Sequence, residues 1–328
     1  MTSPFRPKWV TTLMAMLLLV AACGDDDGGG DGELDHIALQ MSFSPTVAWV
    51  PYLYGIENGI FEEHGIEVEM ISSTGGTFAI QQLNENNVQF AQVDMIGWLA
   101  DQAANDPPTT AVMTLYRRPR VGVLTTIEAY SLDDLVGHSI AHNPFDQFRF
   151  ILPVILELQG LAPDAVGLAP IQLTNSMLVD GQVEAVMVYR GGTLTANLAE
   201  AQRAGIPVYH LEFADFGYQN YEHTIAVRDE VIEGNPDLVR RFLAAVEESI
   251  SGALGASDDE IVDLLATQIP DIDRDVQAAA WNDVKSIWEA DLEFDVDTVA
   301  VLLGYVTDGL GIEHEIQPED VFTNDLRD

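Results

Sequence analysis

From residue 37 onward, short apolar segments alternate with amphipathic segments of helical period. The first set of predicted elements comprises strands at 37–43, 66–71 and 88–94, helices at 46–59 and 77–87, and a helical turn at 61–65. Strands that alternate with helices in this way are typical of a parallel-rich sheet covered by helices on both faces. The hydrophobic pattern therefore predicts an α/β fold.

A second set of similar segments follows between residues 131 and 189. Its parts lie at 131–143, 145–161, 166–172, 175–182 and 183–189. Leu83 to Asp94 and Leu178 to Tyr189 share one plan at equal spacing, and Asp94 and Tyr189 end the two strands. Two similar α/β lobes are the simplest account of this length and alternation.

The C-terminal third is predicted to be mainly helical. Asn235, Pro236 and Asp237 form a helix start, with a capping side chain, a proline at the first helical position and an acid near the positive helix end. Helical spacing then continues to about Gly311, with Trp281 and Trp288 as packing residues.

The N-terminus has the pattern of an export signal. Arg6 and Lys8 precede an apolar run that ends in Leu-Val-Ala-Ala-Cys23, which resembles the bacterial lipobox. We expect a signal peptide over 1–22, a lipidated Cys23, and a flexible Gly/Asp linker to residue 36. This predicts an extracytoplasmic protein, periplasmic or at the cell surface, that is lipid-anchored to the membrane. An ordinary signal cleaved nearby is the alternative.

Composition excludes several classes of function. Fourteen Lys and Arg against 53 Asp and Glu give a formal charge of −39, which disfavours nucleic acid and anionic membrane surfaces as partners. Cys23 is the only cysteine, and the chain has no HExxH, P-loop, GxGxxG or GxSxG motif. We therefore expect no catalytic residue, no metal and no cofactor. The many acids leave a secreted acid–base enzyme open as an alternative.

Several short motifs occur in the order found in one known family. They are Phe43-Ser44-Pro45, Gly59-Ile60-Phe61, Gly65-Ile66-Glu67-Val68, Thr74-Gly75-Gly76, Val88 to Ala91, and a second patch over 215–246. With them the chain resembles extracytoplasmic solute-binding proteins of ABC importers, in particular the NMT1/THI5-like group. That group includes binders of thiamine-pyrimidine precursors, sulfonates and nitrate. Its enzyme branch, a pyrimidine synthase, requires a cysteine cluster that this chain lacks.

The resemblance implies a type II periplasmic-binding-protein fold. In that fold two α/β lobes are joined by two crossing strands, and ligand is held between them by hinge closure. On this basis lobe I would comprise 37–122 plus 223–328, including the helical C-terminal segment, and lobe II would comprise 123–222. The implied partners are a small-molecule ligand and an ABC permease in the membrane, and we expect a monomer.

Ligand-binding candidates follow from the ends of predicted strands, because ligands of open α/β sheets lie beyond the carboxyl ends. The candidates are Phe43, Ser44, Trp49, Thr74, Gly75, Gly76, Asp94, Tyr116, Asn143, Phe145, Tyr189, Tyr218 and Tyr221. Their aromatic rings can sandwich a planar ring, and Asp94 can accept from a ring amino group. Equally, Trp49 could be core and Asp94 a helix cap.

The function predicted from the sequence is capture of a small planar or heterocyclic nutrient, such as a thiamine-type pyrimidine, without covalent chemistry. A small anion (sulfonate, nitrate or aromatic carboxylate) is the alternative ligand, read by Arg117, Arg118 and Arg120. Those arginines could instead form a structural salt-bridge cluster, the interpretation that we favour. A ligand-sensing partner of a membrane signalling protein would share the same fold.

Overall fold

The computed structural model describes residues 34–288 and 291–327. The predicted signal peptide, Cys23 and the linker up to residue 33 lie outside the described residues. Among the helices of the described part, none combines the length and apolar character needed to cross a membrane.

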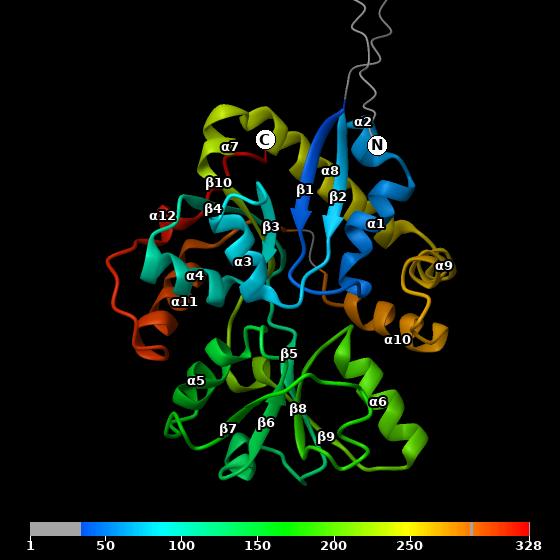
Figure 1. Ribbon diagram of the computed structural model, residues 1–328, viewed down its shortest axis with the longest axis vertical. Helices are drawn as coiled ribbons and strands as arrows, with labels where there is room; N and C mark the ends of the chain where they lie inside the picture. Colours follow the sequence, from blue (N-terminus) through cyan, green and yellow to red (C-terminus); the bar gives the residue numbers. More distant parts are fainter. Residues whose placement is uncertain (1–33, 289–290, 328) are drawn as a thin grey trace, which may run out of the picture. The chain divides into compact units, whose positions relative to one another are not determined.

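Two five-stranded sheets organise the body of the chain (Figure 1), and from here on lobe I and lobe II mean the parts built around the first and the second sheet, respectively. The first, in lobe I, has the order β2-β1-β3-β10-β4, with bounds Ile66–Ile71, Asp35–Gln40, Phe90–Val93, Glu222–Arg228 and Thr109–Tyr116. The second, in lobe II, has the order β7-β6-β8-β5-β9, with bounds Gly167–Pro170, Ser139–His142, Ala185–Tyr189, Val121–Thr125 and Tyr209–Glu212. This architecture confirms the predicted α/β class.

Each sheet is mixed because the chain returns through it. β1 is parallel to β2 and β3, as predicted, but β10 is antiparallel to both β3 and β4. In lobe II, β5 is likewise antiparallel to β8 and β9. The chain passes between the sheets twice, through residues 117–120 after β4 and through residues 217–221 before β10.

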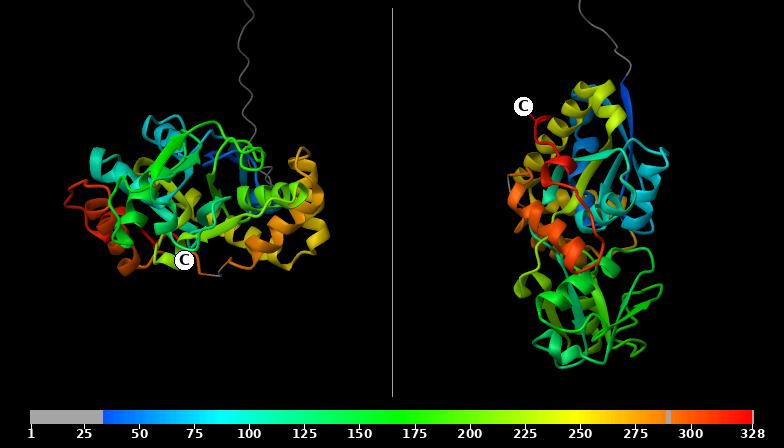
Figure 2. Two further views of the ribbon diagram at one scale, coloured as in Figure 1. Left: turned by 90° about the horizontal axis from the view of Figure 1, so that it is seen from below. Right: turned by 90° about the vertical axis from the view of Figure 1, so that its left-hand side faces the viewer.

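Helices cover both faces of the lobe I sheet, as Figure 2 shows from two further directions. They are α1 Val50–Glu57, α2 Ile60–Glu63, α3 Gly76–Asn84, α4 Met95–Asn105, α7 Asp229–Gly234, α8 Pro236–Gly255, α9 Asp258–Gln268, α10 Arg274–Lys285, α11 Val296–Asp308 and α12 Pro318–Val321, with a 3-10 turn η1 at Val47–Trp49. Phe90 packs in the cluster that contains α1 and α8, whereas Ala91 and Val93 pack in the cluster that contains α3 and α4. Because side chains alternate in direction along β3, they pack against two separate helical layers, one on each face of the sheet.

Lobe II carries two α-helices, α5 Phe148–Leu158 and α6 Thr193–Ala204, and the 3-10 turns η2 Leu132–Leu135 and η3 Phe213–Phe216. The segment 175–182, which repeats the helical plan of the first set in sequence, forms turns. The predicted helix start at Asn235 is confirmed, because its side chain accepts from the backbone N–H of Leu238. Trp281 and Trp288 pack edge to face at 5.7 Å between ring centroids.

Candidate ligand-binding site

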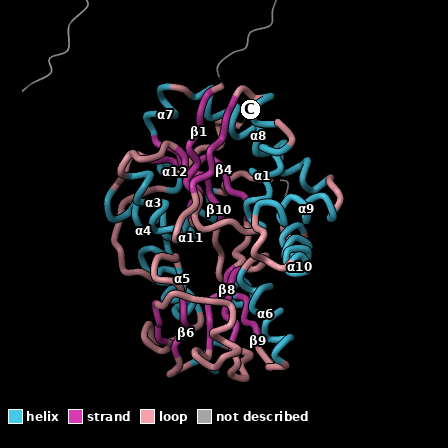
Figure 3. Tube along the Cα trace, turned by 45° about the vertical axis from the view of Figure 1, so that its right-hand side comes forward, coloured by secondary structure: helices cyan, strands magenta, loops and turns pink. Residues whose placement is uncertain are grey.

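A cavity of about 100 Å³ lies where the two lobes meet. In the tube view of Figure 3 the facing sheet ends come from β8 on one side and from β10 and β4 on the other. The residues of lobe I that line the cavity are Ser42, Phe43, Thr46, Ala48, Gly76, Asp94, Glu222 and His223. Those of the first crossing segment and of lobe II are Arg120, Asn143, Asp146, Gln147, Met187, Tyr189, Arg190, Gly191, Gly192 and Thr193.

Asp94 is placed at the cavity by the end of β3 and the start of α4. It is the N-cap residue of α4 by position; it forms no full capping hydrogen bond, but the nearby backbone N–H groups of Ile96 and Gly97 favour its charged form. Asn220 Nδ2 donates to Asp94 Oδ1 at 3.1 Å. Burial, with the nearby Glu222 carboxylate, raises the pKa of Asp94 to about 7. Near neutral pH this group can therefore either donate or accept a hydrogen bond.

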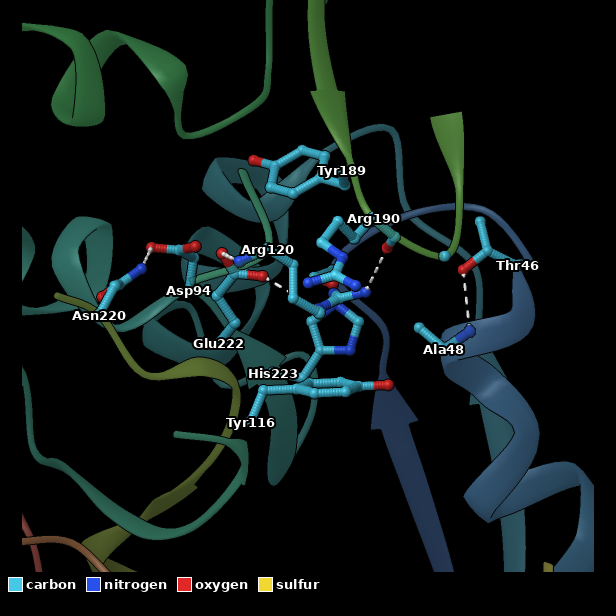
Figure 4. Close-up of polar contacts among 12 residues, drawn as sticks. Thr46, Ala48, Asp94, Tyr116, Arg120, Tyr189, Arg190, Asn220, Glu222 and His223 are labelled. Atoms are coloured by element: carbon cyan, nitrogen blue, oxygen red, sulfur yellow. Dashed lines mark hydrogen bonds and ion pairs between the residues drawn. The ribbon is translucent and has the colours of Figure 1, made fainter. Parts of the chain in front are cut away.

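Arg120 holds a buried polar cluster together beside Asp94 (Figure 4). Its backbone N–H and Nε donate to the Glu222 carboxylate at 2.8 and 3.1 Å, and its Nη1 donates to the Arg190 carbonyl at 3.0 Å. The guanidinium also lies 4.1 Å from the Tyr116 ring centroid, in cation–π geometry. Burial raises the pKa of Glu222, and the Arg120 contacts oppose that rise.

His223 takes part in this cluster as a neutral imidazole. Arg120 Nη2 lies 2.8 Å from His223 Nε2, and since arginine only donates, Nε2 must accept and the ring proton must sit on Nδ1. Burial and the Arg120 charge lower the pKa of His223 well below its usual range. Its backbone φ of 54° lies in the left-handed region, which is uncommon for a residue other than glycine.

The Tyr189 ring closes the cavity from lobe II, opposite Asp94 and Arg120 (Figure 4). Burial and the charges of Asp146, Asp94 and Glu222 raise the pKa of Tyr189 well above its usual range, so its hydroxyl stays protonated. Phe43 adds a second aromatic ring to the lining, from lobe I. Together the two rings supply apolar faces of the kind that contact a planar ligand.

Gln147 brings an uncommitted amide to the same cavity. Its side chain is 2% exposed, yet neither its amide nitrogen nor its amide oxygen has a hydrogen-bond partner among the described residues. It packs against Gly76 and Gly97, and an added Cβ would come within 2.7 Å and 1.6 Å of its amide atoms, respectively. A buried amide without partners is costly, so a ligand that pairs with it would gain affinity.

The lobes also touch outside the cavity. The Phe145 carbonyl of lobe II accepts from the backbone N–H of Thr77 in lobe I at 3.3 Å, next to Gly75. On the other side, Arg190 Nη2 lies 2.6 Å from Asp283 Oδ1 of α10, and Asp283 also accepts from the backbone N–H of Gly191. These contacts hold the two lobes together around the cavity.

The structure places five of the sequence-derived candidates on the cavity wall: Phe43, Gly76, Asp94, Asn143 and Tyr189. Ser44 lies in an adjoining recess. Thr74 is exposed, and Gly75 and Phe145 meet at the lobe contact, with the Phe145 ring 55% exposed.

The other four candidates are buried away from the cavity. Trp49 is part of the lobe I core. Tyr116 is stacked on Trp288 at 5.5 Å with Arg120 over its ring. Tyr218 stacks on Tyr305, while the Tyr221 hydroxyl accepts from the Asp295 backbone N–H at 2.9 Å. These tyrosines are buried because C-terminal residues between Trp288 and Tyr305, whose position the sequence could not give, cover them.

The site also contains residues that strand-end reasoning missed. Glu222 and His223 lie at the amino end of β10, which reaches the cavity because that strand runs antiparallel to β3. Only the direction of β10 could have indicated them. Arg190 to Thr193 and Asp146 to Gln147 follow β8 and β6, so the same reasoning extended by a few residues would have included them.

The arginines of the predicted cluster have partners within the protein. Arg117 pairs with Asp291 and donates to the Glu293 carbonyl, and Arg120 pairs with Glu222. The cavity wall carries three carboxyl groups (Asp94, Asp146 and Glu222) against two guanidinium groups (Arg120 and Arg190). No group of three or more His, Cys, Asp or Glu residues suited to a metal ion occurs within the described ranges.

The geometry is thus that of a two-lobed binding protein, and comparison with known proteins gives the family. The family model described as NMT1/THI5 like matches residues 47–259, and the chain belongs to this family. The predicted resemblance is therefore confirmed.

Two curated relatives are binding proteins, in agreement with the expectation that the chain is not an enzyme. Riboflavin-binding protein RibY of Chloroflexus aurantiacus is 26% identical over 285 residues, covering 84% of this chain and 78% of that protein. Formylaminopyrimidine-binding protein of Halalkalibacterium halodurans is 23% identical over 245 residues, covering 73% of this chain and 72% of that protein.

Solved structures with the same fold include a protein from Bordetella bronchiseptica, with a TM-score of 0.73 at 17% identity, covering 90% of this chain and 96% of that chain. The periplasmic aliphatic sulphonate binding protein SsuA of Escherichia coli matches with a TM-score of 0.65 at 15% identity, covering 84% and 86%. The fold is the predicted periplasmic-binding-protein fold.

Proposed function

We propose that this protein is the extracytoplasmic solute receptor of an ABC importer and that it captures a planar heterocyclic nutrient between its lobes. The observation that carries the proposal is the cavity between the lobes, where Tyr189 and Phe43 supply ring faces and Asp94 and Gln147 supply hydrogen-bonding groups. Both curated relatives bind heterocycles by name, which supports the same ligand class. A thiamine-type aminopyrimidine is one such ligand.

The charge balance of the cavity disfavours the anionic alternative. Arg120 pairs with Glu222, and Arg190 pairs with Asp283 and Glu212, so both guanidinium charges are already offset by carboxylates within the protein. The formal charge of −39 on the whole chain repels anions further. A neutral ring, or one with amino groups that donate to Asp94, is not subject to this electrostatic repulsion.

A thermal-shift panel tests the ligand class. The panel contains an aminopyrimidine, formylaminopyrimidine and riboflavin on one side, and an alkanesulfonate and nitrate on the other. At a concentration of about 100 times its Kd, a ligand that binds only the folded state stabilises it by about 2.7 kcal/mol. For a protein of this size that raises the Tm by several degrees. Stabilisation by the anions alone would overturn the heterocycle proposal.

We further propose that Cys23 carries the lipid anchor and that the receptor works as a monomer beside its permease. Replacing Cys23 with alanine is expected to move the protein from the membrane fraction to the soluble fraction, because the thiol that takes the lipid is lost. Solute affinity is expected to stay unchanged, since the cavity lies within the body that begins after residue 33. Fractionation and a binding titration check both; retention of the variant in membranes would contradict the anchor.

A further inference from the structure

A second recess adjoins the cavity on the lobe II side. Its volume is about 250 Å³, and we call it the annex. Phe43, Asn143, Met187 and Thr193 line both the annex and the cavity, so the two spaces are neighbours with a shared wall.

The annex is lined by neutral hydrogen-bonding groups. Its polar side chains are the amides of Asn143, Gln172, Asn175 and Asn197 and the hydroxyls of Ser44 and Thr193, with Thr174 beside them. Among the described residues that line it, none is acidic, basic or a histidine. A phosphate or carboxylate would find no counter-charge there, in a protein that is already strongly acidic.

One side chain of this lining, Asn197, has a hydrogen-bonding atom without a partner among the described residues. Its side chain is 6% exposed, and its Nδ2 donates to the Thr193 carbonyl at 2.8 Å and to Asn175 Oδ1 at 3.4 Å. Asn197 Oδ1 is buried and has no hydrogen-bond partner within the described chain. An unpaired buried acceptor is satisfied by a donor such as a hydroxyl group.

We propose, building on the function proposed above, that the ligand is a heterocycle that carries an uncharged, polyhydroxylated five-carbon substituent. The ring occupies the cavity between Tyr189 and Asp94, and the hydroxylated chain extends into the annex. There, hydroxyl groups donate to Asn197 Oδ1 and exchange hydrogen bonds with the neighbouring amides, which both donate and accept. A ribityl chain and a ribose ring share this chemistry, so flavins and nucleosides are both candidate sources.

Matched ligand pairs test the proposal by isothermal titration. Riboflavin is compared with lumiflavin, which lacks the ribityl chain, and a pyrimidine nucleoside is compared with its free base. In at least one pair we expect the hydroxylated member to bind about tenfold or more tightly, since several hydrogen bonds distinguish the two. Riboflavin phosphate is expected to bind more weakly than riboflavin, because its phosphate finds no cation in the annex.

Two variants connect the difference to the annex. Asn197→Leu removes the unpaired acceptor, and Asn175→Ala changes an exposed residue of the loop that follows β7, where folding is not at risk. Either is expected to lower the affinity for the hydroxylated member and to leave the affinity for its parent ring unchanged. Gln182→Ala, in the exposed turn before β8 and outside the lining of the annex, is the matched control.

The outcomes separate this proposal from the broader function. Equal affinities within both pairs, or tighter binding of riboflavin phosphate than of riboflavin, would overturn the annex proposal. Neither result would contradict the proposal that the protein is a receptor for a heterocycle. Binding of formylaminopyrimidine with no binding of any flavin or nucleoside would do the same. If no heterocycle of either panel binds, both proposals fall.

Discussion

Replacing Asp94 with asparagine is expected to weaken binding of the heterocyclic ligand by about 100-fold and, in the absence of ligand, to stabilise the protein above neutral pH. The loss of affinity follows because asparagine cannot present a charged acceptor, and hydrogen bonds to charged groups contribute about 1.5–3 kcal/mol. Asn220 can still donate to the oxygen of the new amide, so the local geometry is retained.

The effect on stability follows from the raised pKa of Asp94. The folded state raises this pKa from 3.8 to about 7, so it holds the proton more tightly than the unfolded chain does. Stability that comes from this group is therefore present at low pH and is lost as the pH rises from about 4 through 7. An asparagine has no such cost, and the Tm of the variant relative to wild type should rise by several degrees between about pH 4 and pH 7 and stay constant above that.

Calorimetry at several pH values and titration with the ligand measure the two effects. Asp133→Asn serves as the control, since it removes the same charge from an exposed position of lobe II. A difference in Tm that does not change with pH, or an affinity equal to that of wild type, would show that Asp94 does not act as a buried carboxyl group at the ligand.

A Gly75→Ala substitution is expected to prevent full closure of the lobes and to lower ligand affinity by about 30-fold or more, which corresponds to roughly 2 kcal/mol. A Cβ at this position would lie 2.1 Å from the Phe145 carbonyl oxygen and 2.4 Å from its carbonyl carbon. Backbone atoms cannot move aside as a flexible side chain can. The backbone of Gly75 is extended, so alanine is compatible with lobe I itself.

Small-angle scattering with and without ligand measures closure, and titration measures affinity. Wild type should contract on binding, whereas the Gly75→Ala variant should stay expanded, with its ligand-free Tm near that of wild type. Gly304→Ala is the matched control, because Gly304 lies inside α11 and an added Cβ there meets no atom within 4 Å. Contraction and affinity like those of wild type in the Gly75→Ala variant would mean that the Phe145 contact is absent from the bound form.

The candidate site could be predicted in part because its chemistry follows local rules. Asp94 and Asn143 come directly after a strand and Tyr189 is the last residue of one, and a strand end can be located from the period of two in hydrophobicity. Phe43 and Gly76 also follow β1 and β2 closely. By contrast, Tyr116, Tyr218 and Tyr221 occupy strand ends or crossings but are covered by residues more than 70 positions away in sequence. Local patterns carry no information about such cover.

The sequence by itself determined the α/β class, the two sets of alternating elements, the family and the acidic charge that excludes several partners. Only the tertiary structure decided which polar groups share one enclosure. β10 enters its sheet antiparallel and so carries Glu222 and His223 to the carboxyl ends of β1 and β3. The partners of Arg120 and the lack of a hydrogen-bond partner for Asn197 Oδ1 likewise depend on how distant segments pack. Strand direction and such long-range pairing arise from packing of the whole chain, whereas hydrophobic periodicity is set residue by residue.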